Sequence, residues 1–215
     1  DPLIWLSYIA AATEKICLGT GVMIMPQRNP LVTAKAVATL DRLSKGRMIL
    51  GVGSGWLEEE FDALGVSFDD RGDRTDEYLE AMRQAWSSDV ASYDGDFVSF
   101  SDVYSRPQPV NRHVPIVVGG HSKRAARRAG ELGDGFFPGR GNPQELSILF
   151  DHARMCAEKC GRDPEALEFT AGGPTTADYV EQLAEIGVTR MIVPPMAPAQ
   201  FAEFGEEVIA QFSAL

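Results

Sequence analysis

The segment Gly119-Gly120-His121-Ser122 has the residue types of a phosphate-binding turn. It follows an apolar, strand-like run and leads straight into a predicted helix. Adjacent glycines let the backbone come close to a ligand, and Ser122 can cap a helix whose first N–H groups carry the positive end of its dipole. Basic side chains follow at Lys123, Arg124, Arg127 and Arg128. The alternative is a tight strand-to-helix turn with a solvated basic face, in which His121 is only a turn residue. This motif alone does not decide between the two.

A second glycine-rich segment, Gly51-Val52-Gly53-Ser54-Gly55, ends another predicted strand. Missing side chains at a strand end suit a flat ring lying against the backbone. Close packing of neighbouring strands is the alternative, and the glycines alone favour it. Trp56 follows directly, and we expect it either to line a substrate pocket or to staple the next helix to the fold.

Other kinds of catalytic site find little support. Between Glu58 and Glu80 there are ten carboxylates and two arginines, but their spacing fits no compact metal-ligand set, so we expect a solvated helix surface. No nucleophile elbow, Walker loop or HExxH motif occurs. The histidines are too scattered for a catalytic triad, and the cysteines have no second ligand pair: His113, His121, His152, Cys17, Cys156 and Cys160. A bound cofactor is therefore expected to perform the chemistry, and we predict no metal.

Strand-like and helix-like segments alternate along the chain. Apolar runs predict strands at 16–24, 47–53, 115–119, 135–137, 167–170 and 190–193. Helices are expected at about 3–13, 30–45, 122–132, 142–160, 175–186 and 198–213. Asn29-Pro30 opens the second of these helices and Gly46 ends it.

Strands that are apolar throughout are buried on both faces, which predicts parallel strands covered by helices. We predict an α/β fold, a (β/α)8 TIM barrel that lacks its first two βα units, since only six strands are visible and a helix precedes the first. We expect a single domain over residues 1–215, with an insertion at about 57–112. Asp94-Gly95 predicts a hairpin with a two-residue turn within this insertion. From spacing alone, an open doubly wound sheet is the alternative.

The composition limits the classes of partner. The chain has 215 residues and a formal net charge of −11, which disfavours nucleic acid or a membrane surface as the main partner. No apolar run is long enough to span a membrane, and the first residues show no signal-peptide pattern. An odd, sparse set of three cysteines fits a reducing compartment, so we predict a cytoplasmic protein. The chain does not begin with Met, which predicts either processing or a fragment.

Several segments, in order along nearly the whole chain, resemble the bacterial luciferase-like superfamily. They are Leu18–Val22, Arg28–Pro30, Ala38–Arg47, Leu50–Trp56, Glu58–Phe61, Arg71–Tyr78, Arg106–Pro109 and Pro115–Gly120. The closest similarity is to the branch of coenzyme F420-dependent oxidoreductases, and a branch that uses FMN shares many of these motifs.

This resemblance implies a set of cofactor contacts. A cis peptide bond between Gly21 and Val22 would back the flavin-like ring, and Val52, Gly53 and Ser54 would contact it. The phosphate would lie on Gly119, Gly120, His121 and Ser122, with help from Arg140. The family often dimerises through helices that correspond to residues 3–13 and 30–45, so a homodimer is expected.

Three hypotheses follow. The first is hydride transfer between coenzyme F420 and a small organic substrate. The second is an FMN-dependent luciferase-like monooxygenase. The third is an inactive truncated barrel that acts only as a fragment or a dimeric scaffold. The segments that match the family identify no catalytic acid or base.

Overall fold

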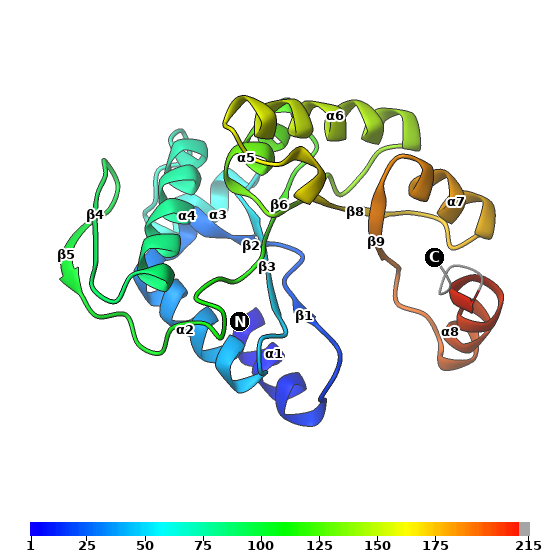
Figure 1. Cartoon of the computed structure of the whole chain (residues 1–215), viewed down its shortest axis with the longest axis horizontal. Coiled ribbons are helices and arrows are strands. Elements are labelled where there is room, and N and C mark those ends of the chain that lie inside the picture. The colour runs from blue at the N-terminus through cyan, green and yellow to red at the C-terminus, as the bar shows by residue number, and fades with distance from the viewer. Residues whose placement is uncertain (211–215) are drawn as a thin grey trace. The chain divides into compact units, whose positions relative to one another are not determined.

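The computed structural model describes residues 1–210 and divides the chain into two compact units (Figure 1). Unit 1 comprises Asp1–Gly119 with Leu132–Asp134, and unit 2 comprises Gly120–Glu131 with Gly135–Leu215. The single domain expected over residues 1–215 stays a prediction. No helix within residues 1–210 combines the length and the apolar character needed to cross a bilayer.

The sheet of unit 1 consists of parallel strands. β3 (Met48–Gly53) pairs with β1 (Leu18–Gly19) and β2 (Met23–Ile24) on one side and with β6 (Ile116–Gly119) on the other. The run 16–24, expected to be one strand, is therefore two short strands separated by a bulge. The bulge forms because the Thr20 hydroxyl donates to the Gly51 carbonyl at 2.7 Å, which draws the chain out of the regular ladder.

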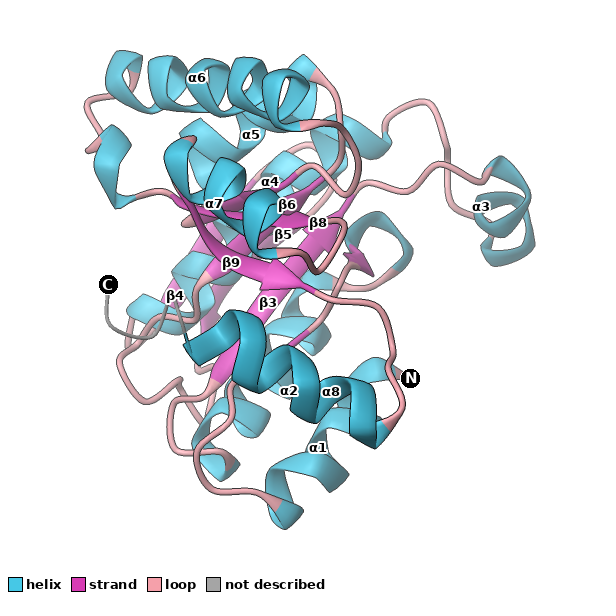
Figure 2. Ribbon diagram, turned by 90° about the vertical axis from the view of Figure 1, so that its right-hand side faces the viewer, coloured by secondary structure: helices cyan, strands magenta, loops and turns pink. Residues whose placement is uncertain are grey.

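Unit 1 also contains four helices, of which the first two match the helices predicted at 3–13 and 30–45. They are α1 (Pro2–Ala12), α2 (Pro30–Leu43), α3 (Glu58–Leu64) and α4 (Arg71–Ser87). The Asn29 side chain accepts from the backbone N–H groups of Leu31 and Val32, which confirms the predicted cap of α2. α2 ends in two left-handed residues, Lys45 and Gly46. Figure 2 shows α3 standing apart from the rest of unit 1.

Arg47 joins the ends of α1 and α2 to the start of β3. Its Nε donates to the Ser44 carbonyl at 2.8 Å, and its Nη1 donates to the Thr13 hydroxyl and the Ile16 carbonyl at 3.1 and 2.8 Å. Its Nη2 donates to the carbonyls of Ala10 and Thr13 at 3.0 and 2.9 Å. A guanidinium has five N–H groups, so Arg47 uses all of them on the open ends of neighbouring segments.

A hairpin follows α4, formed by the antiparallel strands β4 (Ala91–Asp94) and β5 (Ser99–Val103). The predicted hairpin is confirmed, but the predicted two-residue turn is wrong, because four residues separate the paired Asp94 and Ser99. The reason lies on α4. The Glu77 carboxylate accepts from the backbone N–H groups of residues 96, 97 and 98 at 2.9, 2.8 and 2.6 Å, and this holds a wider loop.

Unit 2 repeats the strand-then-helix order. The elements are α5 (Lys123–Leu132, whose last residue falls in unit 1), β7 (Gly135–Phe137), α6 (Pro143–Lys159), β8 (Glu168–Gly172), α7 (Ala177–Glu185), β9 (Val188–Ile192) and α8 (Pro198–Phe204), followed by a π-helical turn (Gly205–Ile209). β8 pairs in parallel with β7 and with β9. The predicted α/β class is therefore confirmed in both units. Positions 211–213 of the predicted last helix lie outside the described residues.

The core of unit 2 is aromatic. Phe150 on α6 stacks on Phe169 of β8 with ring centroids 4.2 Å apart, and it meets Phe136 of β7 edge-on at 6.2 Å. All three rings are buried. This contact fixes α6 against the two strands, because offset and edge-on aromatic pairs prefer such geometries.

Asp134 of unit 1 holds the start of β6. Its carboxylate accepts from the Ile116 backbone N–H at 2.8 Å and pairs with Arg83 of α4 at 3.0 Å and His113 at 3.2 Å. Burial alone would raise the pKa of this carboxyl, but the His113 hydrogen bond, the Arg83 charge and the Ile116 N–H outweigh it and hold the pKa below its usual value.

Substitution of Asp134 should therefore destabilise unit 1 in a pH-dependent way. An acid whose pKa is lowered by folding contributes stability above its unfolded pKa, about 3.9, and loses it as the pH falls through the folded pKa. We expect Asp134→Asn to lower the free energy of unfolding by roughly 1–3 kcal/mol at pH 6, and by clearly less at pH 3. Urea unfolding at the two pH values measures this.

Asp89 provides the control, because it is exposed and pairs only at the surface with Arg106 and Arg112. Asp89→Asn should change stability little at either pH. An Asp134→Asn loss that stays the same at pH 3 would contradict the assigned role of the ionised carboxylate.

Candidate functional site

The bulge between β1 and β2 contains a cis peptide bond between Gly21 and Val22. The prediction of this bond, made from the family resemblance, is confirmed. Gly21 is exposed, and a Cβ placed on it would meet no heavy atom within 4 Å. The bulge therefore presents its backbone to open space at the edge of the sheet where the strands of unit 1 end.

The Val22 side chain packs against glycines of two neighbouring strands. A Cβ on Gly53 would lie 2.9 Å from Val22 Cγ2, and one on Gly119 would lie 2.8 Å from Val22 Cγ1. At Gly51, a Cβ would lie 1.8 Å from the Thr20 carbonyl oxygen, which no side chain could tolerate. Of the two interpretations of this glycine run, close packing of neighbouring strands accounts for Gly51 and Gly53.

The predicted ring contacts of unit 1 thus fall into two groups. Gly21, Val22 and Ser54 reach the surface at least in part, whereas Val52 and Gly53 are buried behind Val22. Val52 pairs with Met23 of β2 and with Val118 of β6, so it holds the strand ends in register.

The turn after β3 is built around Gly55, which is left-handed with φ +85°. The Arg71 Nε donates to the Gly55 carbonyl at 3.2 Å, and Phe61 is fully buried against the turn. Trp56 is 81% exposed, so the prediction that it staples the next helix is wrong. Phe61 fills that role because it lies on the inner side of α3.

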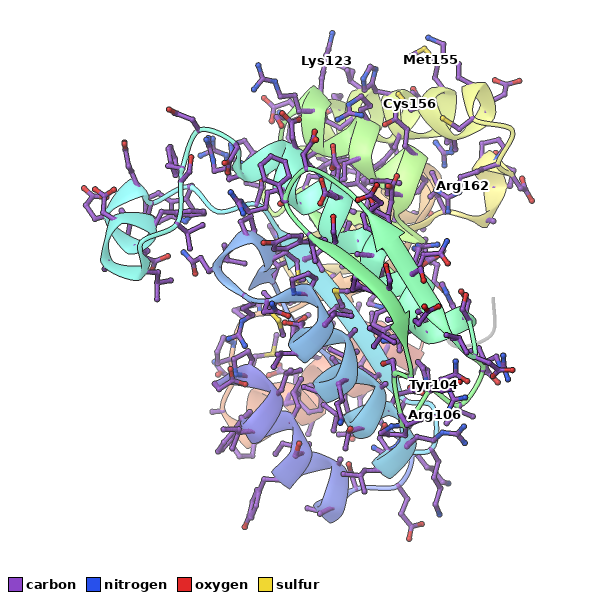
Figure 3. The ribbon with its side chains drawn as sticks, turned by 90° about the vertical axis from the view of Figure 1, so that its left-hand side faces the viewer. Tyr104, Arg106, Lys123, Met155, Cys156 and Arg162 are labelled. Atoms are coloured by element: carbon purple, nitrogen blue, oxygen red, sulfur yellow. The ribbon has the colours of Figure 1, made fainter. Side chains whose placement is uncertain are left out.

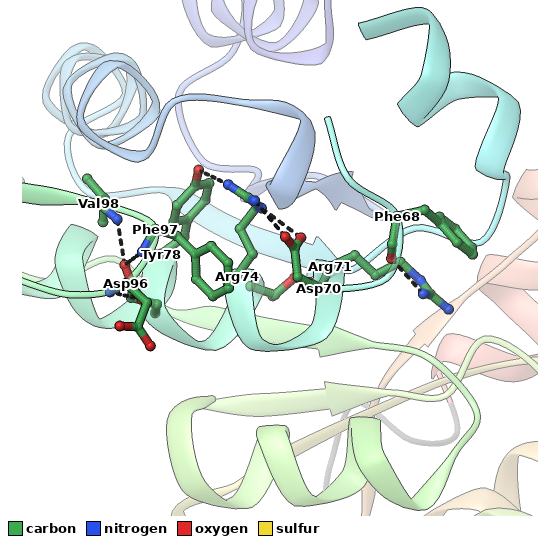
Figure 4. A network of polar contacts seen from close by, with 10 residues as sticks. Phe68, Asp70, Arg71, Arg74, Tyr78, Asp96, Phe97 and Val98 are labelled. Carbon is green, nitrogen blue, oxygen red and sulfur yellow. Dashed lines mark hydrogen bonds and ion pairs between the residues drawn. The ribbon is translucent and has the colours of Figure 1, made fainter. Parts of the chain in front are cut away.

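Carboxylates of the acidic stretch have structural partners (Figure 4). Asp70 receives two hydrogen bonds from Arg74 at 3.0 and 2.8 Å, and these bonds lower the pKa of its carboxyl. Arg74 also lies over the Phe97 ring, 4.4 Å from its centroid. Within residues 1–210, no cluster of three or more His, Cys, Asp or Glu side chains could hold a metal ion.

Three residues without a predicted role organise this region: Arg71, Arg74 and Glu77. They lie within the segment Arg71–Tyr78, one of those that resemble the luciferase-like superfamily. Their spacing on one helix was visible, but their partners at positions 55 and 96–98 are distant in sequence, so only the folded chain shows what they bind.

Of the predicted phosphate segment, Gly119 belongs to unit 1, and Gly120–Ser122 lead into α5 in unit 2. Gly120 is left-handed with φ +127°, and its backbone N–H donates to the Phe137 carbonyl at 3.1 Å. Ser122 Oγ accepts from the Ala125 N–H at 3.2 Å, which confirms the predicted helix cap. The Ser122 hydroxyl hydrogen is not used in this bond, because the oxygen is the acceptor.

Two predicted residues from different loops of unit 2 meet here. Arg140 Nη2 contacts His121 Nε2, and both side chains are exposed. Because a guanidinium can only donate, a hydrogen bond between these two atoms would have His121 Nε2 as the acceptor. The contact brings Arg140 beside His121, just before α5, and the role of His121 stays a prediction.

The basic residues of α5 have different surroundings. Lys123 and Arg124 are exposed, and Lys123 projects outward from the helix (Figure 3). Arg127 pairs with Glu131, and Arg128 is buried. A solvated basic face formed by all four residues is therefore wrong for Arg128, which is buried.

The model of the luciferase-like monooxygenase family matches residues 1–211 of the sequence. The chain belongs to this luciferase-like family. It is 32% identical over 223 residues to an uncharacterized protein of Mycobacterium tuberculosis, a match that covers 99% of this chain and 76% of the relative.

Two functionally named relatives of this luciferase-like chain use different cofactors. An F420-dependent glucose-6-phosphate dehydrogenase of Kineococcus radiotolerans is 37% identical over 78% of the chain, and an FMNH(2)-dependent dimethylsulfone monooxygenase of Pseudomonas putida is 30% identical over 93%. The chain spans only 51% and 55% of these two proteins.

The luciferase-like chain also resembles the coenzyme F420 dependent tetrahydromethanopterin reductase from Methanopyrus kandleri. The TM-score is 0.85 at 20% identity, over 99% of this chain and 88% of the reductase. At this identity the likeness shows the fold, and it confirms the predicted barrel-type α/β architecture.

The packing of Val22 against glycines in this luciferase-like chain can be tested by a double-mutant cycle. We expect Gly53→Ala to destabilise by about 1–3 kcal/mol, because the new methyl group would overlap Val22 Cγ2. Val22→Ala removes that atom, so the double variant should regain most of the loss. Thermal and urea unfolding measure both.

Gly205→Ala is the matched control, because a Cβ there meets no heavy atom within 4 Å. It should not destabilise the protein. If Val22→Ala fails to relieve the Gly53→Ala defect, Val22 is not what requires glycine at this position.

Proposed function

We propose that this chain binds coenzyme F420 and uses it for hydride transfer to or from a small organic substrate. The observation that carries the proposal is the bulge at Gly21–Val22, whose exposed backbone borders open space at the strand ends of unit 1. Family membership supports it, as does the 37% identity to an F420-dependent dehydrogenase.

The residues of unit 1 fit the flat ring. A planar ring needs a backing without protruding side chains, and Gly21 provides one because nothing lies beside its Cα. Val22, held in place by Gly53 and Gly119, supports the bulge from behind. We therefore assign Val52, Gly53 and Gly119 the role of positioning Val22, and Gly21, Val22 and Ser54 the role of contacting the ring.

The residues of unit 2 fit a phosphate. Its donors are the Ser122 hydroxyl, the N–H groups at the start of α5 and the guanidinium of Arg140, which His121 holds in place. Lys123 and Arg124 add positive charge nearby in sequence. Backbone N–H groups, hydroxyls and arginine are the groups that bind phosphate in proteins.

The cofactor, when bound, supplies the redox chemistry. The chain's own contribution is to orient the ring through the bulge of unit 1, which makes an encounter between the substrate and the bound ring effectively unimolecular. The proposal assigns no residue as catalytic acid or base.

An FMN-dependent monooxygenase is the second candidate. FMN also combines a flat tricyclic ring with a phosphate, so the same residues fit it. The 30% identity to an FMNH(2)-dependent monooxygenase over 93% of the chain favours this alternative.

Cofactor titration separates these proposals. We expect the full chain to bind F420 with micromolar or better affinity, and more tightly than FMN. Gly21→Leu should weaken binding at least about tenfold, because the side chain would occupy the space proposed for the ring, while Gly205→Leu, at another position with open space, should leave it within about twofold. Fluorescence of the cofactor measures each affinity.

Other outcomes of the cofactor titration would point to a different function. Tighter binding of FMN than of F420 would favour the monooxygenase. If neither cofactor binds to the full chain at micromolar concentration, the chain is not an F420- or FMN-dependent enzyme by itself. Riboflavin, which has the ring but no phosphate, reports the ring contacts of unit 1 separately.

We also propose that the chain forms a homodimer through α1 and α2. Leu3 and Ala10 of α1 are buried, whereas Ile4, Trp5 and Tyr8 are 74%, 66% and 72% exposed. The Trp5 and Tyr8 rings stack with centroids 6.4 Å apart. α1 is therefore apolar on its outer side as well, which is typical of a helix that packs against a partner.

Charged residues on this face should dissociate the dimer. We expect Trp5→Glu with Tyr8→Glu to convert the dimer to monomer, because a buried unpaired charge is costly. Ile148→Glu, at a 62% exposed apolar position on α6, is the control and should not change the mass. Sedimentation equilibrium gives the masses, and a wild-type monomer at all concentrations would exclude the dimer.

A further inference from the structure

Trp56 is the most exposed of the chain's three tryptophans. Its exposed fraction is 81%, against 66% for Trp5, whose ring stacks on Tyr8. Trp86 is fully buried, and its Nε1 donates to the Ala34 carbonyl at 2.9 Å. Among the described residues, no aromatic ring stacks on Trp56. Its indole therefore contributes little to the packing of unit 1.

The backbone that carries Trp56 is nevertheless rigid. A Cβ at Gly55 would lie 2.6 Å from Phe61 Cε2, so the turn rests directly on this buried ring. Phe61 meets Phe68 edge-on at 5.2 Å, and the Arg71 guanidinium lies 3.6 Å from the centroid of the Phe68 ring. Arg71 also binds the turn directly, because its Nε donates a hydrogen bond to the Gly55 carbonyl.

A second tether joins this region to the end of β2. Gln27 Nε2 donates to the Glu60 carboxylate on α3 at 3.2 Å. Ile24 of β2 pairs with Gly53, and its Cγ2 would be 3.0 Å from a Cβ at Gly55. The turn therefore leaves the sheet of unit 1 at the same edge as the Gly21–Val22 bulge, which precedes β2 directly.

A large apolar ring on a rigid turn loses little conformational entropy when it binds a ligand, and tryptophan is frequent at binding sites for this reason. Glu58, Glu59 and Glu60 follow the indole on α3, and the next large exposed apolar side chain, Leu64, lies at the far end of that helix. The indole is therefore the main apolar surface at the start of the segment. The ligand group that best matches the Trp56 indole is flat, uncharged and apolar.

We propose that Trp56 is the specificity-determining residue of the site, and that its indole stacks against a flat apolar part of the organic substrate. This inference rests on the proposed function, and it adds a class of substrate, one with an aromatic or similarly planar group next to the reacting carbon. Trp56 acts by contact with substrate, whereas Phe61 and Arg71 position it.

The test uses the full chain labelled with 5-fluorotryptophan, which yields one ¹⁹F resonance for each of Trp5, Trp56 and Trp86. Trp5→Phe and Trp56→Phe assign the signals. Acetophenone is the flat aromatic probe, and acetone is the matched probe without the ring. We expect acetophenone to shift the Trp56 resonance saturably and acetone to produce no saturable shift. The resonances of Trp5, on the proposed dimer face, and of the buried Trp86 should move little.

Variants separate stacking from structural effects. Saturation-transfer NMR should show that Trp56→Ala weakens acetophenone binding about tenfold or more, while Trp56→Phe retains it within about threefold. A Trp56 resonance that stays unchanged, or that only follows Trp5, overturns the proposal, and so does an equal loss in the two variants. F420 and FMN titrations of the same sample report separately on the proposed function, because Trp56 can be titrated whether or not a cofactor binds.

Discussion

The arrangement of unit 1 depends on how closely its strand ends approach one another at Val22. Gly51 admits the Thr20 carbonyl, and Gly53 and Gly119 admit the two methyl groups of Val22. Side chains at these positions would push the bulge away from β3 and β6. The bulge is packed tightly on this side. On its other side, Gly21 is exposed to open space, and the proposed ring contact rests on this surface.

Arginines provide a second level of organisation in a chain whose net charge is −11. Arg47 binds the open ends of α1 and α2, and Arg71 binds the turn after β3. Most of these bonds are made to backbone carbonyls rather than to exposed carboxylates. This matters because exposed ion pairs contribute little, whereas unsatisfied carbonyls at helix ends are costly. The acidic stretch after β3 is ordered differently: Arg74 pairs with the Asp70 carboxylate, and the Glu77 carboxylate accepts from backbone N–H groups of the hairpin loop.

Predictions from sequence were most accurate where a pattern extends over many residues. Apolar strands and capped helices were found because burial repeats along each element, as in β3 and α2. Predictions failed where a distant residue decides the local geometry. The Asp94-Gly95 pair favours a two-residue turn, but the Glu77 carboxylate on α4 binds three backbone N–H groups and selects a wider loop. Trp56 was expected either at a pocket or packed against the next helix, and only its exposure in the folded chain excludes the packing role.

The sequence by itself determined the α/β class, the order of the elements, the family and the positions of the glycine-rich segments. These features depend on local composition and spacing, which short segments of the sequence already contain. The tertiary structure alone decided what the glycines are for, which basic residues of α5 are exposed and which aromatic ring supports the Gly55 turn. Such outcomes depend on contacts between residues far apart in the chain, whose distances are set only when the strands pair and the side chains pack.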